Sequence, residues 1–205
     1  MESIYGSKEP AMRAAMERLL DQIEDIRKNL TVKLGMDPVD HVLSRIKSEE
    51  SMRDKCRRRN LPETVESATE KIYDAIGIRV VCAFLNDVYL FRQKLLELPG
   101  VRIAEEKDYI RRAKPNGYRS LHLILHVPEG FYAEIQLRTV SMDTWAALDH
   151  QLQYKKELGE NTALIVEELR RCANELASTD VSMQTIRDMI MEANEVENTS
   201  GGGHA

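Results

Sequence analysis

Cysteine is scarce in this chain of 205 residues, and the few cysteines present form no metal-binding pattern. Cys56, Cys82 and Cys172 make no CxxC pair, which argues against a zinc site. The first residues, MESIYGSKEP, lack the basic and apolar segments of a secretory signal, so we expect reduced thiols and a cytoplasmic protein. An uninterrupted apolar run of about 18 residues is also missing, so we expect no membrane span.

The chain also lacks an excess of positive charge. Its net charge is −5 at pH 7, which argues against a protein that coats nucleic acid, because such binding depends on neutralising phosphates. Local basic clusters remain, among them Arg57 to Arg59 and the pair Lys155 and Lys156. Taken alone, such runs are usually solvated surface.

Apolar periodicity predicts a mixture of helices and strands in one domain. Apolar residues spaced three and four apart predict a helix over residues 9–30. Ser48 is typical of a helix N-cap and Pro62 of a stop, so we expect a helix over 49–59, whereas residues 39–47 fit a helix or a strand. Other predicted elements are strand 77–85, helix 87–97, strand 101–109, a hairpin of 121–127 and 131–137, and helices after Thr139.

Basic side chains gather around residues 45–55. If residues 39–47 are extended, Arg45 and Lys47 project from one face of a strand that leads to a helix. Ser51 and Lys55 share a face of that helix at i and i+4. We therefore expect these four donors to converge, and guanidinium and ammonium groups of this kind bind phosphates.

Two acidic residues flank predicted strands. Asp74 precedes the strand 77–85, and Glu134 lies within an apolar strand, where alternation puts it on one face with Gln136 and Arg138. Either residue alone fits a surface carboxylate. Two acids on neighbouring strands can also hold a Mg²⁺ that bridges the phosphates of a nucleotide, and Tyr118, in a loop after Gly117, can stack on a base.

Several motifs together resemble one known family. SRIKSEESMRDK, DAIGIRVV, EEKDYI, PNGYRSLH, AEIQLRT and MDTWAALDHQLQYK resemble, in order and spacing, the synthetase domain of the RelA/SpoT homologues. The resemblance covers about residues 40–156, and the chain length is similar to that of the small alarmone synthetase branch, of RelP and RelQ type. Such proteins are GTP pyrophosphokinases, which move the β,γ-pyrophosphate of ATP to the 3′-hydroxyl of GDP or GTP. The implied fold is α+β, with a mixed β-sheet of nucleotidyltransferase type flanked by helices.

The resemblance implies a role for each matching residue. Arg45 and Arg79 would stack on the adenine of ATP, while Lys47, Ser51 and Lys55 would hold its phosphates. Asp74 would be the principal Mg²⁺ ligand, and Glu134 would polarise the acceptor hydroxyl and approach the metal. The implied GDP- or GTP-binding residues are Lys107, Lys114, Asn116, Tyr118, His122 and Gln136, with guanine stacked on Tyr118.

The resemblance also implies how the chain is divided. We expect an N-terminal helical extension at 1–36, a synthetase core at 37–158, C-terminal helices at 159–196 for assembly into a homotetramer, and a disordered tail at 197–205. No His-Asp dipeptide occurs, so the hydrolase domain of bifunctional members has no counterpart. Long members often have arginine where this chain has Glu105, which leaves the preference between GDP and GTP open.

Two other functions stay open on the sequence. Some similar small members place the pyrophosphate on the 3′ end of tRNA, and a basic surface near Arg57 to Arg59 or Lys155 would be the feature to seek. RNA therefore remains a candidate acceptor or regulator. A catalytically silent nucleotide- or RNA-binding module would require loss of the metal-binding acids, and both Asp74 and Glu134 are present.

Overall fold

The computed structural model describes residues 3–153 and 162–200. Five strands form one mixed sheet in the order β1-β2-β5-β4-β3, in which β2 and β5 are parallel and the other neighbours antiparallel. The strands are β1 (Val39–Ile46), β2 (Ile76–Cys82), β3 (Arg102–Asp108), β4 (Leu121–His126) and β5 (Tyr132–Thr139). The segment 39–47, which fitted either element, is therefore mostly a strand.

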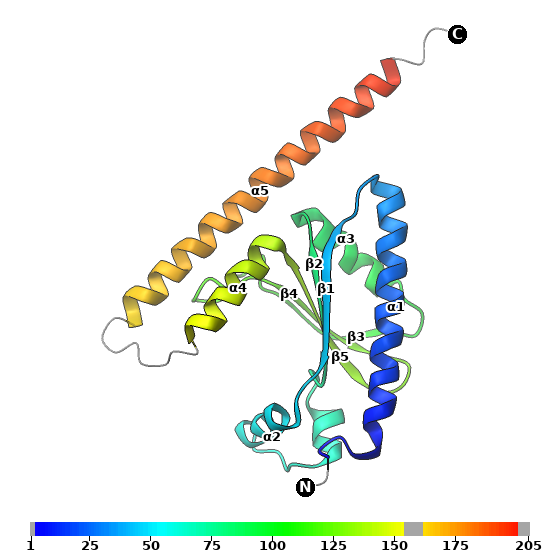
Figure 1. Cartoon of the computed structure of the whole chain (residues 1–205), viewed down its shortest axis with the longest axis vertical. Helices are drawn as coiled ribbons and strands as arrows, with labels where there is room; N and C mark the ends of the chain where they lie inside the picture. The colour runs from blue at the N-terminus through cyan, green and yellow to red at the C-terminus, as the bar shows by residue number, and fades with distance from the viewer. Residues whose placement is uncertain (1–2, 154–161, 201–205) are drawn as a thin grey trace.

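Helices lie on both sides of this sheet (Figure 1). The larger ones are α1 (Glu9–Leu34), α2 (Glu49–Arg58), α3 (Leu85–Leu96), α4 (Val140–Gln153) and α5 (Thr162–Ser200), and the short turns are η1 (Gly6–Lys8) and η2 (Ser67–Lys71). The fold is α+β, as the sequence predicted. No helix in the described ranges is both long enough and apolar enough to cross a membrane.

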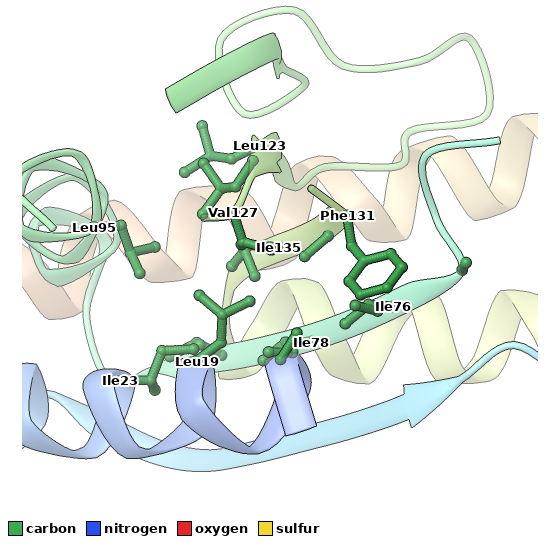
Figure 2. Packing of buried hydrophobic residues seen from close by; sticks show 14 of the residues in the cluster. Leu19, Ile23, Ile76, Ile78, Leu95, Leu123, Val127, Phe131 and Ile135 are labelled. Atoms are coloured by element: carbon green, nitrogen blue, oxygen red, sulfur yellow. The ribbon is translucent and has the colours of Figure 1, made fainter. Parts of the chain in front are cut away.

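The hydrophobic core lies between the sheet and α1 with α3. Leu19 and Ile23 of α1 pack in the same cluster as Ile78 and Ile135 of the central strands (Figure 2). The helix predicted over 9–30 is confirmed, and its apolar stripe faces the sheet. Although residues 1–36 were expected to be an extension, α1 covers one sheet face and leaves the opposite face available for polar side chains.

The N-terminus of α2 is fixed by the predicted cap. The Ser48 hydroxyl accepts a hydrogen bond from the backbone N–H of Ser51 at 3.3 Å. Glu49 and Glu50 follow in the first turn, where the helix dipole favours negative charge. The cap therefore fixes where α2 begins after β1, and Lys55 in the last turn of α2 contacts Asp74.

The C-terminal segment is one helix within the described residues. We expected a disordered tail from residue 197, but α5 continues to Ser200, because helical hydrogen bonds within the backbone do not require apolar contacts. Residues 201–205 of that tail, and the pair Lys155 and Lys156, lie outside the described residues. The start of the expected C-terminal region, residues 159–161, also lies there.

A buried ion pair attaches α5 to the body of the protein. Arg187 Nη1 lies 2.7 Å from Asp87 Oδ1, and their side chains are only 5% and 2% exposed. Nearby, Gln184 accepts a hydrogen bond from the backbone of Asn86 at 3.0 Å. Burying these two charges costs much desolvation free energy, so either charge left without its partner would destabilise the fold.

Removing one member of this pair is expected to destabilise the fold strongly. Arg187→Met leaves the Asp87 carboxylate buried without its cation, at a cost of about 3–5 kcal/mol in the free energy of unfolding. Replacing both residues by apolar ones, Asp87→Leu with Arg187→Met, should recover most of that loss. Urea unfolding of the native, single and double variants measures this, and additive losses would contradict the expected coupling.

Candidate active site

Two rows of side chains cross the sheet on the face opposite α1. In the first row, the strand register aligns Arg45 of β1 with Gly77 of β2 and Glu134 of β5. In the second row, Arg79 of β2 is aligned with Gln136 of β5, which pairs with His122 of β4 and so with Lys107 of β3. Six predicted site residues therefore lie on one face: Arg45, Arg79, Lys107, His122, Glu134 and Gln136.

A cavity of about 200 Å³ opens over β1, β2 and β5. Gly77 contributes no side chain between Arg45 and Glu134, which leaves space above the sheet. Asp74, in the turn before β2, lines the same cavity. The lining residues are Leu43, Ser44, Arg45, Asp74, Gly77, Ile78, Arg79, Glu134 and Gln136.

Two lysines converge on Asp74 at the edge of this cavity. Lys47 Nζ lies 3.0 Å from Asp74 Oδ2, and Lys55 Nζ lies 2.5 Å from the same oxygen. The other oxygen, Oδ1, is buried and has no hydrogen-bond partner in the part of the chain that the structure describes. A buried carboxylate oxygen without a partner is costly, which makes Oδ1 suited to a cation.

Ser51 does not join this group. Its side chain is exposed, accepts a hydrogen bond from the Ser48 hydroxyl at 2.9 Å, and is absent from the cavity lining. Of the four donors expected to converge, the structure brings Lys47 and Lys55 to Asp74 and places Arg45 in the same cavity. Ser51 lies at the N-terminal end of α2, about one turn before Lys55.

A second cavity, of about 190 Å³, opens over β3, β4 and β5. It contains Lys107 and Lys114, both predicted to contact the acceptor, and it also contains Glu134. Glu134 is thus shared by the two cavities. The lining residues are Glu105, Lys107, Tyr109, Lys114, His122, Ile124 and Glu134.

Hydrogen bonds hold the Glu134 carboxylate in its charged form. Burial alone would raise the pKa of Glu134, but His122 Nδ1 at 3.2 Å and Gln136 Nε2 at 2.9 Å both contact its oxygens. These contacts, with the positive charge of Lys55, lower the pKa of Glu134 to about 2. The carboxylate is therefore ionised at neutral pH and fixed in orientation.

The low pKa predicts how stability depends on pH. Because the pKa of Glu134 is about 2 in the fold and 4.5 for an unperturbed glutamate, as in the unfolded chain, its ionised form stabilises the fold above pH 4.5. That contribution is lost as the pH falls through 4.5 toward 2. Chemical unfolding of the ligand-free native chain and of Glu134→Gln should give a stability difference that shrinks as the pH falls over this range; a pH-independent difference would contradict it.

Tyr118 and Asn116 support the site from outside the second cavity. The Tyr118 hydroxyl accepts a hydrogen bond from Arg138 Nη2 at 2.7 Å and lies 2.7 Å from His122 Nε2. The Asn116 side chain accepts a hydrogen bond from the Tyr118 backbone at 3.2 Å, which shapes the loop. Neither lines the cavity, whereas Tyr109 does.

Three residues of the site had no predicted role. Tyr109 lines the second cavity and lies in the EEKDYI stretch, whose match to the family was the signal available for it. Arg138 and Asp143 form an ion pair at 3.0 Å beside Tyr118. Arg138 was placed on the Glu134 face by strand alternation, but Asp143 resembles an ordinary acid in the first turn of a helix.

The fold and the site together define a transferase-like arrangement: two cation-lined cavities meet at one carboxylate on a mixed sheet. The family model described as "Region found in RelA / SpoT proteins" matches residues 44–159. The chain belongs to the RelA/SpoT family.

The relatives of this chain include small alarmone synthetases. GTP pyrophosphokinase YwaC of Bacillus subtilis is 39% identical over 148 residues, which cover 69% of this chain and 70% of that protein. The structure of small alarmone synthetase 2 from Bacillus subtilis matches with a TM-score of 0.76 and 34% identity, over 85% of this chain and 94% of that one. Small alarmone synthetase 1 from the same species, bound to its product pppGpp, matches with a TM-score of 0.76 and 28% identity, over 89% and 95%.

Proposed function

We propose that this chain is a GTP pyrophosphokinase. It transfers the β,γ-pyrophosphate of ATP to the 3′-hydroxyl of GDP or GTP and releases AMP with ppGpp or pppGpp. The observation that carries this proposal is the position of Glu134 between two cavities that each hold positive side chains. Family membership and the named activity of YwaC support the same reaction.

The first cavity is assigned to ATP. Arg45 and Arg79 face it from neighbouring strands, and two guanidinium planes on either side of a base bind it by stacking. Lys47 and Lys55 lie at its edge as point charges for the phosphates. In the ligand-free chain both lysines contact Asp74, so ATP binding would redistribute these contacts.

The second cavity is assigned to GDP or GTP. Lys107 and Lys114 supply positive charge there, and Tyr109 presents an aromatic ring. Lys114 Nζ lies 4.6 Å from the ring centroids of both Tyr109 and Tyr118, so its charge is placed beside both rings. For Tyr118 to stack on guanine, Lys114 would have to move from the Tyr118 ring toward the phosphates of the acceptor.

Glu134 acts on the acceptor hydroxyl. The Tyr118 hydroxyl accepts from Arg138 and can therefore donate to His122 Nε2, which leaves His122 Nδ1–H to donate to Glu134. A carboxylate with a pKa near 2 is a weak base, so its main effect is to orient the 3′-hydroxyl and to stabilise positive charge developing there. This suits pyrophosphoryl transfer, which depends on positioning and charge neutralisation.

The donor set fits Mg²⁺. Asp74 Oδ1 has no partner among the described residues, and Glu134 lines the same cavity, so these two carboxylates would hold the ion together with nucleotide phosphates and water. No cluster of three or more metal-binding side chains occurs in the described ranges, which matches an ion held largely by its nucleotide. When bound, Mg²⁺ neutralises charge on the transferred phosphates.

Assembly into a homotetramer is part of the proposal. Leu148 and Leu152 of α4 are 52% and 46% exposed, and Met189 and Ile190 of α5 are 64% and 55% exposed. These exposed apolar side chains on two helices support a surface that another copy would cover. The nucleotide substrates agree with the cytoplasmic location expected from the sequence.

The decisive experiment offers different acceptors to the purified chain. Incubation with labelled ATP and Mg²⁺ is expected to yield AMP and an equal amount of ppGpp with GDP, or pppGpp with GTP, separated by anion exchange. A parallel reaction contains deacylated tRNA and is resolved on a gel. Label on tRNA alone would replace this function with tRNA pyrophosphorylation, and absence of transfer to every acceptor would contradict both.

A further inference from the structure

A continuous series of polar contacts connects side chains of the two cavities. It begins at Arg79, which lines the first cavity, and ends at Glu134, which both cavities share. Its steps are Arg79 to Asp143 at 3.1 Å, Asp143 to Arg138 at 3.0 Å, Arg138 to Tyr118 at 2.7 Å, Tyr118 to His122 at 2.7 Å and His122 to Glu134 at 3.2 Å.

Asp143 lies between the two arginines of this series of contacts, and its carboxylate contacts both. Its Oδ1 atom contacts both Arg79 Nη1 and Arg138 Nη1, and its Oδ2 atom lies 3.7 Å from His41 Nε2. The Arg138 side chain is only 4% exposed, so water screens its charge poorly. Burial lowers the pKa of Arg79, and the neighbouring charge of Arg138 lowers it further, whereas Asp143 opposes both effects.

The chain places Asp143 there through the junction of β5 and α4. The Thr139 hydroxyl accepts a hydrogen bond from the backbone N–H of Met142 at 3.2 Å, which fixes the first turn of α4 directly after the strand. That turn returns the chain over the sheet, so Asp143 reaches back to Arg138 on β5 and to Arg79 on β2. Arg138 in turn donates to Tyr118 and to Gln136.

We propose that Asp143 is a positioning residue for both substrates, since it holds the Arg79 guanidinium against the ATP cavity and the Arg138 guanidinium against Tyr118. This inference rests on the proposed function. Asp143 lines neither cavity, so it acts through the two arginines. Without its charge the arginines repel each other, and the Arg79 side chain loses its fixed orientation toward ATP.

Asp143→Asn keeps the volume of the side chain and removes the charge. We expect it to weaken binding of a non-hydrolysable ATP analogue about tenfold, the effect of losing one charge-assisted hydrogen bond. GDP binding should weaken about threefold through Arg138 and Tyr118, a loss similar to that of one ordinary hydrogen bond. Glu97→Gln, which neutralises an exposed acid paired with Lys94, serves as the matched control and should leave both dissociation constants unchanged.

A double-variant cycle separates positioning from a general loss of structure. In the Arg79→Ala background, Asp143→Asn should have no further effect on the dissociation constant of the ATP analogue, because the residue through which it acts is gone. GDP binding should still weaken in that background. Calorimetric titration gives both constants, and thermal melting checks that each variant is folded.

The outcomes distinguish this inference from the proposed function. If the native chain binds neither the ATP analogue nor GDP, the proposed function is wrong. If the native chain binds both, and Asp143→Asn binds them as the native chain does, the positioning role is wrong. An equal loss of analogue binding in the native and Arg79→Ala backgrounds would also overturn it, since Asp143 would then act independently of Arg79.

Discussion

Glu134→Gln is expected to lower kcat by about 10²–10⁴, while nucleotide binding stays close to that of the native chain. The substitution keeps the size of the side chain but removes the charge that orients the acceptor hydroxyl. It also presents an amide N–H₂ to His122 and Gln136, both of which donate to the native carboxylate. Turnover should therefore fall much more than affinity.

Steady-state kinetics with ATP and GDP, together with titration of a non-hydrolysable ATP analogue, measures this split. Glu106→Gln is the matched control, because Glu106 lies on β3 near the second cavity but is paired with Arg92 of α3 at 2.6 Å. The control should retain native kcat. If Glu134→Gln turned over within tenfold of the native rate, the carboxylate could not have the role assigned to it.

Much of the fold was predictable because apolar periodicity decides which face each element buries. The stripe on α1 and the alternation in β5 each identified the buried side, and the alternation also placed Glu134 and Gln136 on the open side. Local patterns could not decide segment 39–47, because short apolar runs fit a helix or a strand. Pairing with β2 resolves it, and that pairing joins residues distant in sequence.

The structure brings together predicted site residues that lie far apart in the sequence. Arg45, Asp74 and Glu134 come together because the parallel pairing of β2 with β5 brings residues 77 and 134 side by side. Such register is a tertiary property, which no local spacing contains. For the same reason the sequence could not place Asp143, whose partners lie on two different strands.

Asp74→Asn is expected to weaken metal-dependent turnover but to strengthen the binding of metal-free ATP. It removes a ligand of the proposed Mg²⁺ site, so kcat should fall about 10²–10³ and the metal concentration for half-maximal rate should rise. In metal-free buffer, by contrast, we expect the substitution to strengthen ATP binding. The carboxylate competes with the ATP phosphates for Lys47 and Lys55, so its neutralisation should tighten binding of metal-free ATP by about 1 kcal/mol, or about fivefold.

Titration of ATP in EDTA measures the effect on metal-free binding, and kinetics over a range of Mg²⁺ concentrations measures the effect on turnover. Asp54→Asn is the matched control, since Asp54 lies on the same helix as Lys55 but pairs with Arg57 on the surface of α2. It should change neither quantity. Tighter metal-free binding of ATP together with slower turnover would identify Asp74 as a ligand of the metal. Parallel losses of binding and turnover would instead indicate that Asp74 only orients Lys47 and Lys55.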